Sequence, residues 1–216
     1  IYKEIQMNNN STSVALTRNR KLALAGAFSA LIIVLSLTNL GFISFSPVVS
    51  ITILQIPVIL CATMAGLPAG LFAGFVMGMM SLIKAAMSPS GILDPFFVNP
   101  MCSVLPRMLL GLVAWGLWRV LNLIPRMPKT FFFLFTGFVA TFAHTLMVYG
   151  CIFIFDGADM RAALDSIGMT GAGYFAVVGA GIVSEMVEAA SSLIVCAAVY
   201  AGLFIASNKK SKMTKE

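Results

Sequence analysis

Long apolar runs constrain this chain more than any other feature of its sequence. One of them extends from Phe131 to Phe155 without a single Asp, Glu, Lys or Arg. A hydrophobic stretch of about 18 residues or more with few charges is typical of a transmembrane helix. The composition agrees, because the chain is 59% hydrophobic and only 10% charged, with a mean hydropathy of +0.96. The sequence therefore predicts an integral membrane protein.

Six apolar segments are separated by polar or by Pro- and Gly-containing connections. We expect spans at about 22–37, 51–65, 69–82, 101–121, 131–155 and 174–206. The second and third are near or below the ~17 residues that a helix needs to cross a bilayer, so we expect them to be shielded, tilted or partly unwound beside a cavity. The predicted fold class is an all-α integral membrane protein with six transmembrane helices. Residues 1–19 form a polar leader, 20–206 the membrane domain and 207–216 a basic tail; Met7 looks like a native start, which would make 1–6 an added segment.

The distribution of the net charge of +6 predicts the orientation of the chain. Basic residues gather beside alternate apolar segments, which is the pattern of cytoplasmic loops rather than of a nucleic-acid-binding surface. With both termini cytoplasmic, the outer loops hold only Lys84 and Arg161. A further break in the long final run would place the lysine tail outside, so six spans are favoured. The predicted inside segments contain Lys3, Arg18, Arg20, Lys21, Arg119, Arg126, Lys129, Lys209, Lys210, Lys212 and Lys215.

The sequence lacks the residues that several functional classes of protein require. The sequence has no Gly-rich phosphate loop, no Walker-type Gly-Lys-Ser/Thr and no His and Cys cluster with metal-ligand spacing. An intramembrane enzyme would need a nucleophile or metal ligands gathered at one depth, and the chain has one histidine and no Ser/Lys or Asp/Asp motif. We therefore expect no enzyme, and no cofactor or metal in this chain. The four cysteines are interpreted as small buried hydrophobes: Cys61, Cys102, Cys151 and Cys196.

Arg107 is the main candidate for a functional residue. It lies in an otherwise apolar span, about 10 Å below the outer end that begins at Pro100 if each residue rises ~1.5 Å. A cation at that depth is costly without a partner or a ligand, so an intramembrane arginine is a functional-site hypothesis by default. A planar guanidinium suits an anion through bidentate contacts.

Other polar residues are expected at a similar depth. Glu185 and Glu188 are three residues apart and share one helix face, where a cation or a proton must relieve their repulsion. Arg107 is the obvious cation. His144 falls near mid-depth, with Tyr149 about a turn higher. This convergence favours a pocket open to the outside, although an Arg–Glu pair that joins two helices and a hydrogen-bonded histidine are the simpler structural alternatives.

The first span carries small residues at spacings of three and four. Ala23, Gly26, Ala27 and Ala30 would let another helix approach closely. Packing inside this chain and an interface with another subunit are both consistent with this pattern.

Short motifs along the chain extend from about Arg20 to Ala206. They are Ala23-x-x-x-Ala27, Leu-Pro-Ala-Gly and Gly-Phe-Val-Met-Gly within 67–78, Asn99-Pro100, Val104-Leu105-Pro106-Arg107 and Gly111. In order and total length they resemble the substrate-binding S-components of energy-coupling factor (ECF) transporters, which take up vitamins in many bacteria. The resemblance implies a protein of the bacterial cytoplasmic membrane that binds a vitamin near its extracellular face. It further implies a membrane scaffold subunit and two cytoplasmic ATPases that hydrolyse ATP.

The resemblance also assigns roles to residues. Ala23, Ala27 and Ala30 would face the scaffold subunit, and the outer loops after the first, third and fifth helices would cover the site. The candidate substrate-binding residues are then Arg107, Glu185, Glu188, His144, Asn99, Tyr149 and Asn39.

The resemblance leans toward pantothenate-type members, whose ligand carries a carboxylate. Folate, cobalamin, pyridoxine and hydroxymethylpyrimidine remain alternatives, because the Pro-Arg pair looks common to S-components of differing substrates and Arg107 would then be scaffolding. Two other classes stay open. A self-sufficient secondary transporter of a small organic anion should show an internal repeat, and we see none that is convincing. A purely structural membrane subunit would use each polar group for packing.

Overall fold

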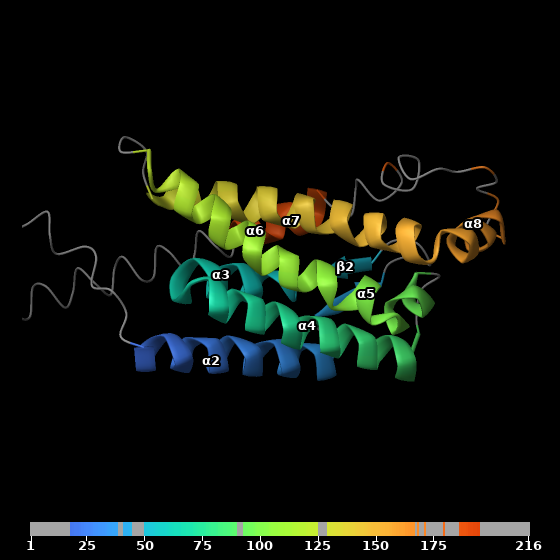
Figure 1. Cartoon of the computed structure of the whole chain (residues 1–216), viewed down its shortest axis with the longest axis horizontal. Helices are drawn as coiled ribbons and strands as arrows, with labels where there is room; N and C mark the ends of the chain where they lie inside the picture. Colours follow the sequence, from blue (N-terminus) through green and yellow to red (C-terminus); the bar gives the residue numbers. More distant parts are fainter. Residues whose placement is uncertain are drawn as a thin grey trace, which may run out of the picture.

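The computed structural model describes residues 18–38, 41–44, 50–89, 93–124, 129–166 and 186–194, together with 168, 171 and 179. Within them the chain is mostly helical, and its long helices lie side by side along a common axis (Figure 1). A one-turn 3-10 helix, η2, covers Asp94–Val98, and residues 186–194 form a further helical segment. The α-helices are α2 (Arg18–Leu37), α3 (Gln55–Ala65), α4 (Leu67–Met87), α5 (Pro100–Ser103), α6 (Leu105–Leu121), α7 (Lys129–Phe155) and α8 (Gly157–Ser166).

Four segments of the described chain are long and apolar enough to cross a membrane. They are Arg18–Leu37, Leu67–Met87, Pro100–Leu121 and Phe131–Phe155. The first, fourth and fifth predicted spans lie within or on these bounds. The third extends to Met87, past the predicted end at 82, so Lys84 lies in the last turn of α4 and not in a loop. The count of six spans, the placement of both termini and the domain bounds remain predictions, because most of 172–216 and all of 1–17 lie outside the described residues.

Three loops contain more regular structure than the sequence predicts. The loop after α2 holds an antiparallel pair, β1 (Phe42–Ser44) and β2 (Ser50–Thr52), in which Phe42 lies opposite Thr52. Both segments carry β-branched or aromatic residues, which favour strands. The all-α prediction is therefore correct apart from this short pair. η2 interrupts the predicted loop before Pro100, and α8 occupies the predicted acidic loop after Phe155.

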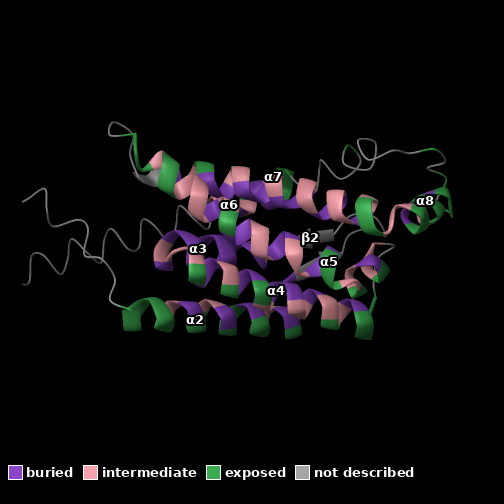
Figure 2. Cartoon of the chain, viewed as in Figure 1, coloured by how far each residue is buried: buried purple, intermediate pink, exposed green. Residues whose placement is uncertain are grey.

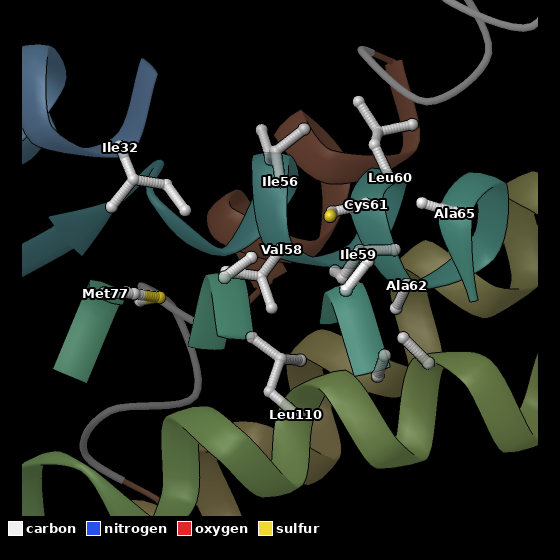
Figure 3. Packing of buried hydrophobic residues seen from close by; sticks show 14 of the residues in the cluster. Ile32, Ile56, Val58, Ile59, Leu60, Cys61, Ala62, Ala65, Met77 and Leu110 are labelled. Atoms are coloured by element: carbon white, nitrogen blue, oxygen red, sulfur yellow. The ribbon is translucent and has the colours of Figure 1, made fainter. Parts of the chain in front are cut away.

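Helix α3 is shielded by its neighbours, as its short length predicts. It contacts α2, α4, α6 and α7, and every residue from 55 to 63 is buried. Figure 3 shows its aliphatic side chains packed among Ile32, Met77 and Leu110 of the surrounding helices. The helix ends at Gly66, whose φ of +97° is a conformation that side chains other than glycine rarely adopt. The chain then reverses directly into α4.

Glycines hold α4 and α6 unusually close together. A Cβ placed on Gly78 would lie 2.6 Å from the Cα atom of Val104, and one on Gly74 would collide with the backbone carbonyl of Arg107. Gly111 of α6 faces the backbone of Gly70 in the same way. The small-residue pattern of the third predicted span therefore packs the α4 backbone directly against the segment that carries Arg107.

Candidate functional site

A break between α5 and α6 positions Arg107. Pro106 has no N–H, so it cannot donate the helical hydrogen bond to the carbonyl of Cys102 four residues earlier. The Nη1 atom of Arg107 donates to that carbonyl instead, at 2.8 Å. The guanidinium also lies over the ring of Phe97, 4.5 Å from its centroid, which is a cation–π contact. The Pro-Arg pair is thus locally complementary: the proline frees an acceptor and the arginine occupies it.

Arg107 keeps unused donor capacity after these contacts. Its side chain is only 5% exposed, and its Nε has no hydrogen-bond partner among the described residues. A buried guanidinium has five N–H donors and carries its charge at all relevant pH values. The arrangement therefore suits an anionic group that approaches the remaining donors.

Glu188, in the helical segment 186–194, is anchored to β2 and α3. Its side chain is 5% exposed. Its Oε2 accepts a hydrogen bond from Nε2 of Gln55 at 2.9 Å, and its Oε1 accepts from the backbone N–H of Thr52. The carboxylate thus joins the segment 186–194 to the end of β2 and the first residue of α3.

Of the two glutamates that could pair with Arg107, only Glu188 lies among the described residues. Arg107 donates to a backbone carbonyl and Glu188 accepts from neutral groups, while the two charges interact through space. The same cation also interacts electrostatically with His144. The carbonyl freed by Pro106 thus accepts from one Arg107 donor, while β2 and α3 each bring one neutral donor to Glu188.

His144 lies on the buried face of α7 and is 5% exposed. Neither Nδ1 nor Nε2 has a hydrogen-bond partner among the described residues. Buried polar side chains are rarely left without partners in native proteins. A neutral imidazole in this state can donate one hydrogen bond and accept another from a bound molecule.

Asn99 and Tyr149 lie near one end of the helices, toward α8. Asn99 caps α5 by accepting from the backbone N–H of Met101 at 3.1 Å, and its Nδ2 donates to Asp156 at 3.1 Å. The thiol of Cys102 donates to the same carboxylate at 3.2 Å. Tyr149 is buried in an apolar cluster with Phe96, Cys102 and other residues of η2, α5, α7 and α8. These contacts tie η2 and α5 to the connection between α7 and α8.

Two further predicted site residues, Asn39 and Glu185, lie outside the described residues. Conversely, sequence reasoning missed Gln55 and Asp156, which make the contacts just given. Gln55 is the one amide in its apolar run between 51 and 65, so its polarity alone could have singled it out. Asp156 follows the apolar run 131–155 directly, in a segment where the sequence predicts no span.

A family model described as ECF transporter, substrate-specific component, matches residues 20–200. This chain belongs to that family. An S-component is a membrane transport subunit, and the span of the match includes every described helix except the first two residues of α2. The suspected family is thereby confirmed.

The S-component is also similar to the pantothenate transporter PanT of Leuconostoc mesenteroides subsp. mesenteroides. The two sequences are 32% identical over 119 residues, which is 52% of this chain and 55% of PanT. The match therefore spans about half the length of that relative, and it agrees with the pantothenate-type leaning of the sequence motifs.

The small residues of α2 lie on the surface of this S-component. Ala23, Ala27 and Ala30 are exposed, and nothing lies within 4 Å of a Cβ placed on Gly26. The opposite face is buried against the neighbouring helices, and Figure 2 shows the buried positions in purple between exposed green ones along α2. Its buried residues are Ala25, Ser29, Ile32 and Ser36. Packing inside this chain, one of the two explanations open from the sequence, does not occur among the described residues.

Proposed function

We propose that this S-component captures pantothenate at the extracellular side of a bacterial cytoplasmic membrane and delivers it inward. The family makes the chain a transport subunit, and the similarity to PanT supports pantothenate as the substrate. Pantothenate is a carboxylate that also carries an amide and two hydroxyls. A site for it needs one cationic group and several neutral hydrogen-bonding groups.

The observation that carries this proposal is the buried Arg107 with its unused donors. A carboxylate that reaches the guanidinium would gain charge-assisted hydrogen bonds in a surrounding of low polarity, where such bonds are strong. The described hydrogen bonds to Glu188 come from Gln55 and Thr52, and its charge also interacts with that of Arg107. The Nε atom of Arg107 has no hydrogen-bond partner among the described residues, so this donor is open to a ligand.

In the proposed site, the other residues recognise the neutral part of the ligand. His144 supplies a donor and an acceptor, and Tyr149 and Asn99 line the approach from the outer end. α5, β2 and α8 lie at the same end of the bundle in Figure 1, which supports a site covered by these outer connections. Asn39 and Glu185 remain predicted members of the site.

Transport would require partner proteins. The proposed partners are a membrane scaffold subunit, which packs against Ala23, Ala27 and Ala30 of α2, and two cytoplasmic ATPases. ATP is hydrolysed by these partners, and this chain uses no cofactor. The exposed small residues of α2 support this arrangement, because small side chains allow helices of different subunits to approach closely.

The test compares pantothenate binding by the purified chain and two arginine variants, using native mass spectrometry and isothermal titration calorimetry in detergent. Wild type should bind pantothenate without ATP. Arg107→Ala should weaken binding by about 10- to 100-fold, because charge-assisted hydrogen bonds contribute roughly 1.5–3 kcal/mol. Arg119→Ala is the matched control, since Arg119 lies at the opposite end of α6, exposed and over Trp115.

Equal affinity of the Arg107 and Arg119 variants would reduce Arg107 to a helix anchor. If the wild-type chain binds another vitamin from a panel and not pantothenate, the proposed substrate would be wrong but the assignment as a vitamin-binding S-component would stand. Uptake by the chain alone in proteoliposomes would instead favour a self-sufficient secondary transporter.

A further inference from the structure

Gln55 is fully buried, and only the nitrogen of its side-chain amide has a hydrogen-bond partner among the described residues. Its side chain is 0% exposed, and its Nε2 donates to Glu188 at 2.9 Å. Its Oε1 has no hydrogen-bond partner among the described residues. A buried carbonyl oxygen without a donor costs free energy, so native proteins rarely retain one without a use for it.

Glu188 determines which way the amide of Gln55 faces. If the amide were turned over, its oxygen would meet a carboxylate oxygen, and two acceptors cannot form a hydrogen bond. The nitrogen therefore stays on Glu188 and the oxygen stays on the other side. Glu188 is itself held by the backbone N–H of Thr52, so the whole arrangement has little freedom to rotate.

The unpartnered oxygen belongs to the same group of residues as the proposed carboxylate site. Glu188 interacts electrostatically with Arg107, and Arg107 with His144. Helix α3, which begins at Gln55, contacts both α6 and α7, which carry these two residues. The Oε1 atom of Gln55 is thus a fixed acceptor in the same group of residues as the Arg107 cation. It comes from α3, a helix in which the sequence motifs did not predict a site residue.

We propose that Gln55 is a specificity-determining residue: its fixed amide oxygen accepts a hydrogen bond from a hydroxyl or amide N–H of the ligand. This inference rests on the proposed function and deepens it. The ligand class is then a carboxylate that also carries a neutral hydrogen-bond donor. A simple carboxylate without such a donor would satisfy Arg107 and leave the oxygen of Gln55 unpaired, and it would be rejected for that reason.

The experiment measures dissociation constants of the full chain for pantothenate and three analogues. Each analogue lacks one donor: the secondary hydroxyl, the primary hydroxyl, or the amide N–H, which is replaced by an ester oxygen. In wild type, at least one analogue should bind about tenfold more weakly than pantothenate, the order of magnitude of one net hydrogen bond. Gln55→Met keeps the length of the side chain and removes both polar atoms. In this variant the difference in affinity between pantothenate and that analogue should disappear, because pantothenate loses its hydrogen bond to Gln55.

Two further variants separate specificity from folding. Gln55→Asn keeps both amide atoms on a shorter side chain that cannot reach Glu188 and the ligand together, so it should also lose discrimination. Thr63→Val is the matched control on α3, because among the described residues its buried hydroxyl bonds to the carbonyls of Ile59 and Leu60 and to no other group. It should keep the wild-type ratio of affinities.

Each outcome decides between the two proposals. Unchanged ratios in both Gln55 variants, with pantothenate still bound, would overturn this inference and leave the proposed function standing. Equal loss of affinity for pantothenate and all analogues would assign Gln55 only to holding Glu188, and would also overturn it. A wild-type chain that binds neither pantothenate nor an analogue would overturn the proposed substrate and this inference with it.

Discussion

The Pro106-Arg107 pair shows how one residue can serve both the helix and the site. Proline removes one donor from the helical ladder, and arginine returns one through Nη1 to the Cys102 carbonyl. That contact uses one of five N–H groups and fixes the direction of the guanidinium. A structural role and a ligand-binding role for Arg107 are therefore compatible, since the anchor restricts the side chain to the orientation that a ligand would need.

The Gln55–Glu188 contact predicts a pattern of thermal stability across three variants. Glu188→Gln should destabilise the protein by about 1–3 kcal/mol, because a neutral amide replaces the charged acceptor and the amide of Gln55 must turn over to keep a hydrogen bond. Gln55→Glu should destabilise it as well, since two carboxylates would be in contact. The double variant Gln55→Glu with Glu188→Gln restores a donor facing an acceptor, and should recover much of the loss.

Thermal unfolding of the purified chain in detergent, followed by circular dichroism, measures this cycle. Additive losses in the double variant would mean that the two side chains do not interact, contrary to the 2.9 Å hydrogen bond.

At the level of helices, the glycines of α4 decide where α6 lies. Gly70, Gly74 and Gly78 are spaced by four residues and line one face of α4. Gly74 and Gly78 face the backbone of Arg107 and Val104, whereas a Cβ on Gly70 would meet Ala62 of α3. The carbonyl of Gly70 is in turn approached closely by Gly111 of α6. Helices in membranes associate through such close packing, because lipid offers no hydrophobic driving force between them. The position and direction of Arg107 thus depend on close backbone packing against a second helix.

Gly74→Ala should therefore impair both stability and binding. The added methyl group would collide with the Arg107 carbonyl and push α6 away from α4, at a cost of about 1–3 kcal/mol for overpacking. We expect a lower midpoint of thermal unfolding and weaker pantothenate binding.

Gly116→Ala in α6 is the control for this prediction. Nothing lies within 4 Å of a Cβ at Gly116, so the variant should be neutral or slightly more stable, as alanine favours helix. Identical behaviour of the two variants would show that the α4–α6 contact is looser than described.

The whole molecule presents apolar surfaces that suit a bilayer rather than water. Large exposed side chains lie on α2 and α4, including Leu31, Val34, Phe72 and Phe75. On α2 they share the surface with the exposed alanines, so this helix offers both bulky and small residues to its surroundings. Lipid tails can pack against a surface of bulky or of small residues, whereas close approach of a second helix requires a surface of small residues.

Ala27→Leu should separate transport from binding. With scaffold and ATPase subunits in proteoliposomes, ATP-driven pantothenate uptake should fall by on the order of tenfold, because the larger side chain prevents close helix approach. Pantothenate binding by the isolated chain should stay unchanged, since Ala27 faces away from the buried residues. Ala86→Leu, an exposed alanine near the end of α4, should leave uptake normal. Normal uptake by the Ala27 variant would place the scaffold contact elsewhere.

The sequence by itself determined the features of this protein that depend on local composition. The apolar runs placed the long helices α4, α6 and α7, because a membrane span is a property of about 20 consecutive residues. Arg107, His144 and Glu188 stood out for a similar reason, as polar residues in apolar surroundings. Only the tertiary structure decided which residues are in contact. Gln55 and Thr52 bind Glu188, which lies more than 130 positions further along the chain. Gly74 packs against the backbone of Arg107. Hydrogen bonds and close packing act over a few ångströms in space, and spacing along a single chain does not report that distance.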